Sequence, residues 1–391
     1  MSIRSIFLTL FVLVSLIHFS CSDSPSSLGS DLLSQDLINI LELDSANDSL
    51  FQSASVYKKV IELSSANRLL LGKKDNIEAG ILIKFLIFFA DSIKQQLTNN
   101  ELSVLSAKVE FTKNYTFGNS TVPIDFSVHK INNNWSTGFT SDSLAILTYD
   151  ANDISFSKTF SDSINGFNFD TQTALNWLKA SADSSIPIDN GLYIKPAMSS
   201  EKIVGFQALT IEDLTIPSLK IIIQKTGVYS DTLSYFPSVD LSVVSGSLPD
   251  VGTENIGIQA GLNSEARLFF DLSSLPKDIV VNYAQLILTV DTIKTITGSS
   301  FTNSVRVNYI TDSTNLAIDS TFSLFLDRDG STFKGSVTSF IQRTLIESNN
   351  QGLLLSASDK LNGVELFAIK GSNAAALAER PNLQIIYTSK K

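Results

Sequence analysis

The stretch RPNLQIIYT at Arg380–Thr388 decides the fold of this chain, because a near copy, IPSLKIII, stands at Ile216–Ile223. In each copy leucine and isoleucine alternate with other residues, which is the two-residue period of a half-buried β-strand. A proline heads each copy, where its missing N–H group is tolerated at the first residue of a strand. Pro217 and Pro381 lie 381 − 217 = 164 residues apart, about the length of one domain. The sequence therefore predicts a duplicated β-module.

Further landmarks recur upstream of both copies. Each half begins with a long apolar strand, in which Phe85 corresponds to Phe270, and with a second strand, in which Ala107 corresponds to Ala284. In the second half, apolar residues at helical spacing predict a short amphipathic helix over Thr338–Leu345. The rest of each half alternates like strand.

Two more correspondences complete the repeat. Gly205 and Gly363 each open a Gly-x-x-x-[Leu/Phe] segment ahead of the closing strand, so we expect them at equivalent positions. Leu219 and Leu383 stand two residues after the two prolines. We expect both leucines to be buried at equivalent places, and their non-equivalence would remove the two-module interpretation.

The N-terminus predicts export. Arg4 precedes an apolar run over residues 6–17 that is shorter than the roughly 20 residues needed to span a bilayer, so residues 1–20 are interpreted as a signal peptide. Cys21 follows and is the single cysteine of the chain. It stands where a bacterial lipoprotein would carry its acylated first mature residue, and two acyl chains give stable membrane anchoring. The alternative is an ordinary cleaved signal with an incidental cysteine, which would leave the protein secreted.

Composition excludes several classes of partner. The chain has 29 Lys and Arg against 39 Asp and Glu, and no basic cluster interrupts this acidic balance. Nucleic acid and anionic membrane surfaces are therefore poor partners, and a lipid anchor is the expected membrane contact. With one cysteine there is no disulfide framework, so apolar burial has to hold the domains.

The second half resembles a known family, the DNRLRE-type modules, which are β-sandwich domains of bacterial surface and secreted proteins classed with carbohydrate-binding modules. The matching residues are RLFFDLSSLPKDIVVNYAQLIL from Arg267, VTSFIQRTLIESNNQGLLL from Val337, and RPNLQIIYT at the end. The resemblance covers about residues 250–388 and is weaker in the first half. It implies a jelly-roll-like sandwich and polysaccharide binding, although fold alone does not transfer a ligand.

We therefore expect an all-β protein with two tandem jelly-roll-like β-sandwich domains, each with a short helix. The predicted boundaries are a signal peptide at 1–20, a lipidated cysteine and flexible tether at 21–50, a divergent first module at 51–225, and a second module at 226–391. The expected location is the cell envelope, anchored to the outer membrane or cell surface.

The candidate ligand-binding residues lie in one Asn-rich loop and one strand. Trp135 stands among three asparagines and a glycine, a loop composition that predicts an exposed ring for stacking on sugar. Asn133 and Asn134 would supply hydrogen bonds, and Tyr193 is a further aromatic candidate. The alternative, a loop tryptophan that folds back over one end of the sandwich, is favoured over the exposed ring. Trp177, in contrast, is expected to pack inward from a short helix.

No catalytic constellation is evident in the sequence. His129 is the only histidine after the signal segment, and no nucleophile elbow, zinc motif or Cys/His metal spacing occurs. No cofactor is expected apart from a structural calcium ion, for which Asp327 and Asp329 in DRDGS are weak candidates. Asp-Gly is also a hairpin-turn signal, and that interpretation is favoured. The leading hypothesis is non-catalytic polysaccharide binding, and the alternative is a structural or adhesive spacer without glycan affinity.

Overall fold

The structure is a computed structural model that describes residues 38–48, 50–119, 121–122, 124–187, 189–209 and 215–390. The predicted signal segment, Cys21 and the first part of the predicted tether lie outside the described residues. Within them, no helix has both the length and the apolar character required to cross a membrane.

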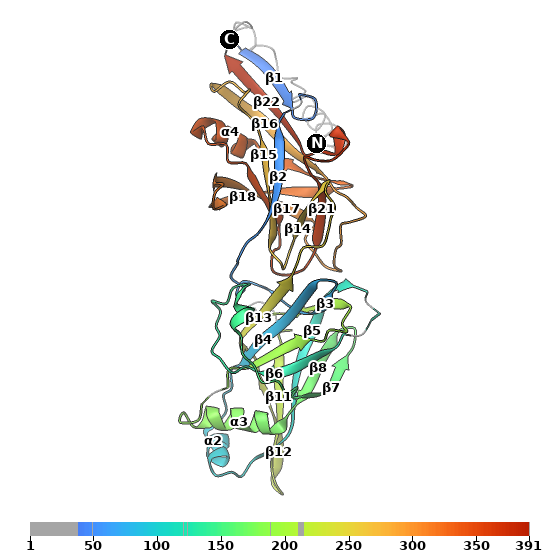
Figure 1. The fold of residues 1–391 in the computed structure, drawn as a ribbon. Coiled ribbons are helices and arrows are strands. Elements are labelled where there is room, and N and C mark those ends of the chain that lie inside the picture. The colour runs from blue at the N-terminus through green and yellow to red at the C-terminus, as the bar shows by residue number, and fades with distance from the viewer. Residues whose placement is uncertain are drawn as a thin grey trace, which may run out of the picture.

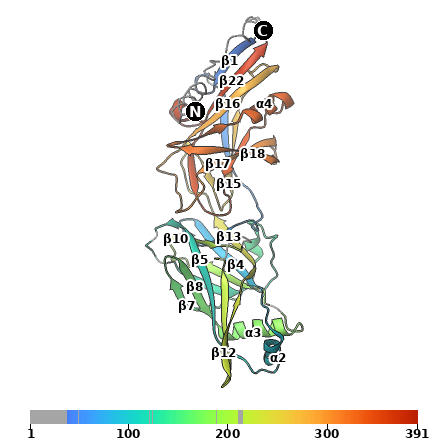
Figure 2. The ribbon, with the colours of Figure 1, turned by 180° about the vertical axis from the view of Figure 1, so that it is seen from behind.

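The chain forms two antiparallel β-sandwiches stacked end to end (Figures 1 and 2). The predicted all-β fold with two tandem sandwiches is therefore confirmed. The N-terminal sandwich contains β3 (Arg68–Lys74), β4 (Ile77–Phe85), α2 (Asp91–Thr98), β5 (Ser103–Gly118), β6 (Phe126–Lys130), η2 (Ser143–Ile146), β7 (Ser155–Phe160), β8 (Ile164–Phe169), α3 (Thr171–Ala182), β9 (Leu192–Pro196), β10 (Lys202–Gln207), β11 (Ser218–Lys225), β12 (Tyr229–Tyr235) and β13 (Pro237–Gly246).

The C-terminal sandwich combines the first two strands of the described chain with its last nine. Its elements are β1 (Ile38–Asp44), β2 (Gln52–Lys58), β14 (Asn255–Gln259), β15 (Ser264–Phe270), β16 (Ile279–Thr289), β17 (Ser304–Asp312), β18 (Ala317–Asp329), β19 (Thr332–Ser336), α4 (Thr338–Glu347), β20 (Leu353–Ala357), β21 (Leu366–Lys370), η3 (Leu377–Glu379) and β22 (Asn382–Lys390).

The two closing strands, β11 and β22, occupy equivalent places. Ile221 lies opposite Ala107 on β5, and Ile385 lies opposite Ala284 on β16. The leucines two residues earlier, Leu219 and Leu383, also share a register, and both are fully buried. Each ladder has a register shift just beyond the alanine, where a bulge changes the twist. The predicted duplication is therefore present down to the pairing of single residues.

The strands β4 and β15 also correspond, as Phe85 and Phe270 predict. Ile83 of β4 pairs with the first residue of β9, and Leu268 of β15 pairs with the first residue of β20, two residues before each phenylalanine. A glycine precedes β9 and β20, with φ of +90° at Gly191 and +87° at Gly352. A Cβ at either position would also press on the backbone of the neighbouring strand, so glycine is required twice.

The proposed correspondence of Gly205 and Gly363 is wrong. Gly205 lies inside β10, opposite Leu70 of β3, whereas Gly363 precedes β21. The register of β21 on β14 places Ala368 at the position of Gly205. Short glycine motifs at loop boundaries shift easily, because a loop can change length without disturbing the ladders on either side.

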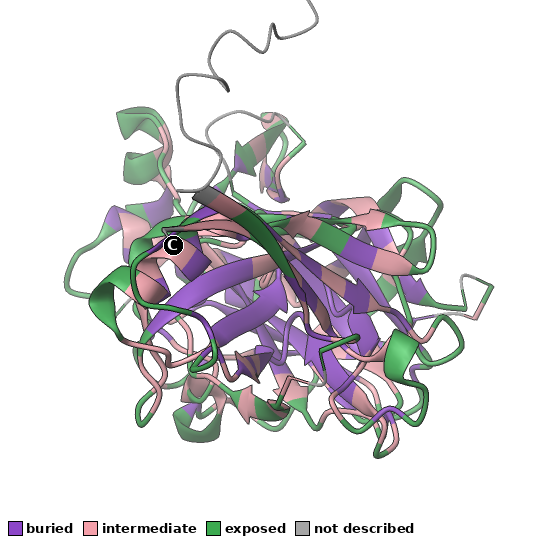
Figure 3. Ribbon diagram, turned by 90° about the horizontal axis from the view of Figure 1, so that it is seen from above, coloured by how far each residue is buried: buried purple, intermediate pink, exposed green. Residues whose placement is uncertain are grey.

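A helix covers the core of each sandwich in the same place. α3 packs against β5 and α4 packs against β16. Asp170 caps α3 by accepting a hydrogen bond from the backbone N–H of Thr173 at 2.8 Å. In α4 the buried residues include Phe340 and Ile341, which confirms the predicted amphipathic helix. Viewed along the long axis, buried residues fill the interior between the strands (Figure 3).

The predicted domain boundaries are corrected by the pairing of four strands. β1 pairs with β22, and β2 pairs with β15, so residues 38–58 belong to the C-terminal sandwich and are neither tether nor part of the first module. β12 pairs with β11, and β13 pairs with β4, so residues 229–246 belong to the N-terminal sandwich. β1 and β2 therefore precede the N-terminal sandwich in the chain but complete the C-terminal sandwich. β12 and β13 precede the C-terminal sandwich but complete the N-terminal one.

A buried polar cluster joins the two sandwiches. The hydroxyl of Tyr115 on β5 donates to Glu365 Oε1 at 2.7 Å and accepts the backbone N–H of Val364 at 3.2 Å. The Arg68 guanidinium carbon lies 4.7 Å from the centroid of the Tyr115 ring, and an Arg68 nitrogen donates to the carbonyl of Ser300 at 3.2 Å. The junction is therefore a specific contact, held by hydrogen bonds that cross from one sandwich to the other.

The junction carries a pH dependence. Burial raises the pKa of Glu365 above its ordinary 4.5, against the opposing effects of Tyr115 and Arg68, while Asp359 adds to the rise. Because the folded state holds the proton more tightly, this contribution to stability is complete below pH 4.5 and is lost as the pH rises through the raised pKa. Denaturant unfolding as a function of pH should show this loss, and Glu365→Gln should reduce the slope. An unchanged slope in that variant would contradict the assignment.

Candidate functional site

The expected exposure of Trp135 is wrong. The side chain is 5% exposed, because the segment after β6 folds over the outer face of β4. Its ring packs with Phe139 at a centroid distance of 6.3 Å and belongs to the same buried cluster as Tyr193. The indole N–H donates to the carbonyl of Asn190. The alternative weighed for this loop, a tryptophan that folds back over the sandwich, describes what is seen.

The other predicted ligand-binding residues do not form one open site with Trp135. The Asn133 side-chain oxygen accepts the backbone N–H of Thr148 at 2.8 Å, so this side chain closes its own loop. Asn134 is exposed on the same loop. Tyr193 is buried in β9, and burial raises the pKa of its hydroxyl. Trp177 is buried, as expected, in the core cluster beneath α3.

The weak calcium candidates lie at a hairpin. Asp327 and Asp329 are at the end of β18, and Asp329 forms an ion pair with Lys334 on β19. Gly330 between the strands has a φ of +56°, as a tight turn requires. Across the described ranges, no group of three or more His, Cys, Asp or Glu side chains is arranged to hold a metal ion.

An apolar pocket lies in the N-terminal sandwich beside α3 and has a volume of about 250 Å³. This is close to the lower end of the roughly 300–1,000 Å³ typical of small-molecule sites. It is built from the end of β4 and the segment that follows, from α3, from the loop before β9, and from β13. The lining residues are Lys84, Phe85, Leu86, Ile87, Trp177, Ser181, Asp189, Gly191 and Ser238.

Lys84 is the one lysine in the lining of this pocket. Its ammonium group donates to the carbonyl of Trp135 at 3.1 Å and lies 4.9 Å from the centroid of the Trp135 ring. Burial lowers the pKa of Lys84, because the charged form loses solvation. None of the ion pairs between described residues includes Lys84. The hydrogen bond that holds its ammonium group is the one to the Trp135 carbonyl.

Asp189 supplies the opposite charge and is oriented by the helix. The Trp177 indole N–H donates to one carboxylate oxygen of Asp189 at 2.8 Å, which leaves the other oxygen for a second partner. Trp177 is itself fixed by Phe169, with the ring centroids 5.4 Å apart. The pocket thus combines an apolar floor with one fixed acceptor and one cation, a pattern suited to a ligand with both apolar and hydroxyl faces.

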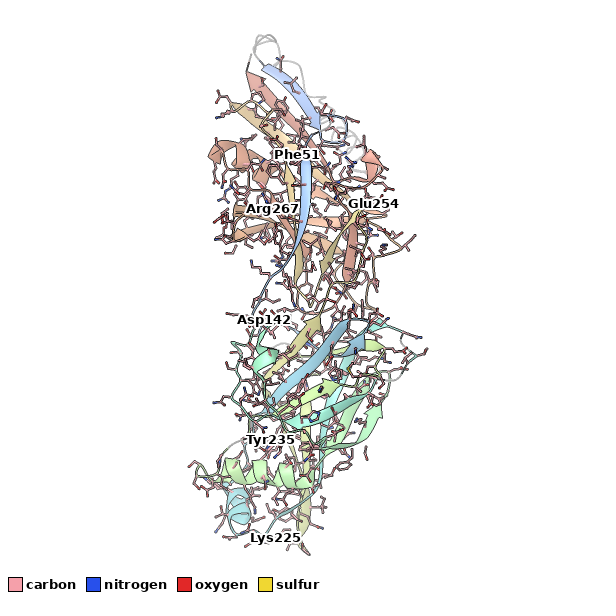
Figure 4. The ribbon with its side chains drawn as sticks, in the orientation of Figure 1. Phe51, Asp142, Lys225, Tyr235, Glu254 and Arg267 are labelled. Atoms are coloured by element: carbon pink, nitrogen blue, oxygen red, sulfur yellow. The ribbon has the colours of Figure 1, made fainter. Side chains whose placement is uncertain are left out.

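An exposed apolar rim adjoins the pocket. Phe88 is 66% exposed and Leu86 is 58% exposed. The backbone N–H of Leu86 donates to the carbonyl of Phe236, another exposed aromatic residue, at 3.0 Å. Phe88 also contacts the ring of Tyr235, which Figure 4 labels close to the helical end of the N-terminal sandwich. This rim extends the apolar floor of the pocket onto the surface.

A second hollow, of about 360 Å³, lies at the junction of the sandwiches. Its lining is mainly polar or charged, including Glu62, Arg306 and Asp359. Ring-stacking surfaces are missing from that lining, so it fits a sugar less well than the pocket beside α3.

His129 does not contribute a catalytic group to either hollow. It is buried in β6, with one ring nitrogen 2.8 Å from the carbonyl oxygen of Asp150 and the other 2.7 Å from the Ser127 hydroxyl. Both ring nitrogens are therefore engaged in local structure.

The candidate residues predicted from the sequence do not include Lys84 and Asp189. Lys84 was visible as the single charge within the apolar run of residues 80–90, which is a usable signal. Asp189 precedes β9 in a loop that has no distinctive pattern, and only the fold brings it to Trp177. No family model matches this chain. No curated protein matches it either.

Proposed function

We propose that this chain is a non-catalytic surface lipoprotein that binds a polysaccharide through the pocket beside α3. The observation that carries the proposal is the apolar floor next to Lys84 and the oriented carboxylate of Asp189. A pyranose ring has an apolar face and hydroxyl edges, and such a lining can satisfy both. The resemblance of the second half of the chain to DNRLRE-type modules supports the same ligand class.

The pairing of the chain ends supports surface display. Ile38 at the start of β1 pairs with Lys390 of β22, so the first described residue lies at the tip of the C-terminal sandwich. In Figure 1 that tip is opposite the end formed by α2, α3 and β12. If Cys21 is lipidated, the N-terminal sandwich is the part held away from the membrane. The pocket beside α3 would then face outward.

The binding prediction is tested with residues 22–391 and a matched pair of lysine substitutions. Lys84→Met keeps the aliphatic stem over Trp135 and removes the charge, whereas Lys73→Met removes a lysine of β3 outside the pocket. Loss of a charged hydrogen bond of about 1.5–3 kcal/mol should weaken glycan binding about tenfold or more. Affinity electrophoresis on a panel of alginates, glucans and pectins measures the effect, with Lys73→Met expected to bind like the unaltered chain.

A spacer without glycan affinity is the second candidate, favoured by the hydrogen-bonded junction and by the crossing strand pairs. Binding to no member of the panel, with and without calcium, would overturn the polysaccharide proposal and favour the spacer. Equal weakening by both substitutions would place the ligand elsewhere on the molecule.

A further inference from the structure

The two strand pairs, β1–β2 and β12–β13, occupy equivalent positions in the two sandwiches. β1 and β12 flank the closing strands, where Leu43 pairs with Ile385 and Leu233 pairs with Ile221. β2 and β13 flank β15 and β4 along the corresponding register. In chain order, each strand pair is followed by the remaining strands of one sandwich. The first pair, β1–β2, nevertheless completes the C-terminal sandwich, and the second pair, β12–β13, completes the N-terminal one. This is an exchange of equivalent strands between two repeats of one chain.

The pairing of β1–β2 with the C-terminal sandwich does not depend on which chain supplies the strands. Seven residues of β2 pair with β15, and seven of β1 pair with β22. Lys59 then donates its N–H to the carbonyl of Asn263 at 3.1 Å. All of these bonds would form equally well with the strands of a second copy.

The segment 247–254 is the hinge between the closed and the exchanged arrangement. In the closed monomer it leads to the C-terminal body that the chain's own β1–β2 complete, and in the exchanged dimer it leads to the body that the other chain's β1–β2 complete. It lies outside the strands and joins β13 to β14. The other crossing, between β2 and β3, is fixed by backbone hydrogen bonds from Ser141 to Ile61 and from Leu63 to Phe139. Opening the segment 247–254 would release β1–β2 together with the N-terminal sandwich as one unit. The junction of Arg68, Tyr115 and Glu365 would then form between chains.

The order of synthesis favours exchange between copies. β2 ends at residue 58 and β14 begins at residue 255, so the strands lie 255 − 58 = 197 positions before the body that they complete. Until β15 and β22 are made, β1 and β2 present unpaired backbone groups. When chains fold close together, as lipid-anchored copies would, β1 and β2 of one copy can pair with the C-terminal body of another. Such domain swapping is a characteristic misassembly of multidomain proteins.

We propose that a second copy of this chain can supply β1–β2 to the C-terminal sandwich, giving an exchanged dimer. The proposal is independent of glycan binding. Because the interface is the same in both forms, the closed monomer is favoured only by its effective concentration, and crowded chains shift the balance towards the dimer.

The test uses two differently tagged versions of residues 22–391 that are synthesised together. One carries Ser55→Cys and the other Arg267→Cys, which are directly opposite on β2 and β15. In the exchanged dimer these cysteines meet across two chains, so a disulfide-linked species carrying both tags is expected on a non-reducing gel. A single chain with both substitutions is the positive control, because it should close the same disulfide internally.

The matched negative control is Glu78→Cys with Ser245→Cys, which face each other on β4 and β13. That ladder stays within one chain in both arrangements, so mixing these chains should give only collisional crosslinking. The expected yield for the 55–267 pair is at least tenfold above this background. A yield no higher than the background, with the positive control closed, would overturn the proposal.

Discussion

Deletion of residues 38–58 is expected to unfold the C-terminal sandwich and to leave the N-terminal sandwich folded, although the deletion borders the N-terminal sandwich in sequence. The deletion removes two seven-residue strands, β1 and β2, from β22 and β15. At roughly 0.5–1.5 kcal/mol for each backbone hydrogen bond, the loss is comparable to the ~5–15 kcal/mol that stabilises a whole domain. The edges of β15 and β22 would also be exposed.

Tryptophan fluorescence and hydrogen exchange separate the two sandwiches in this experiment. Both tryptophans of the chain, Trp135 and Trp177, lie in the N-terminal sandwich, so their denaturant transition should remain, lowered by the loss of the junction contact between Tyr115 and Glu365. Amide protection in β15, β16 and β22 should fall to that of an unfolded chain. A chain that begins at residue 38 is the control, because it keeps both strands. Loss of protection in β3 and β4, with β15 and β22 protected, would contradict the observed exchange.

The duplicated fold could be predicted because its signals are local. Alternation around Leu219 and Leu383 fixes which face of each closing strand is buried, and the proline ahead of each strand marks where it starts. The apolar spacing of Phe340 and Ile341 marks the helix in the same way. These patterns depend on period and composition, which a single sequence carries.

The exchange of strand pairs could not be predicted, because alternation shows that a segment is a strand and not which strand it joins. β1 pairs with β22 and β12 pairs with β11, at equivalent edges of the two sandwiches. The alternation of apolar residues in either strand is therefore compatible with either edge. The Ser and Asp residues that precede β1 favour a flexible tether when composition alone is considered. Only the long-range pairing of Ile38 with Lys390 corrects that boundary.

The burial of Trp135 could have been predicted from the apolar residues of β4 instead of from the composition of its own loop. Ile81, Leu82 and Ile83 are consecutive apolar residues of β4, and all three are buried. A strand that is apolar on both faces has to be covered on both, so some segment must lie over its outer face. The loop that carries Trp135 does so. Its asparagines and glycine describe the turns of that loop and not the direction of the indole ring.

Replacement of Tyr115 by alanine is expected to separate the unfolding of the two sandwiches. Tyr115 is fully buried at the junction, where its hydroxyl binds Glu365 and its ring lies under Arg68. Truncation of a buried aromatic side chain costs about 3–5 kcal/mol. The Glu365 carboxyl would also lose the donor at 2.7 Å. We expect the tryptophan transition of the N-terminal sandwich to shift apart from the exchange-detected transition of the C-terminal sandwich.

Tyr115→Phe separates the hydrogen bond from the packing. Phenylalanine keeps the ring beneath Arg68 and removes the hydroxyl, which also leaves the Val364 N–H without its acceptor. The cost should be about 1–3 kcal/mol, the penalty of leaving a buried polar partner unpaired. Because Gly298 faces the Tyr115 ring, where a Cβ would approach to 2.2 Å, Gly298→Ala should disturb the same contact from the C-terminal side. If Tyr115→Ala left both transitions coincident and unshifted, the junction would not be what couples the sandwiches, and the crossing strands alone would have to do so.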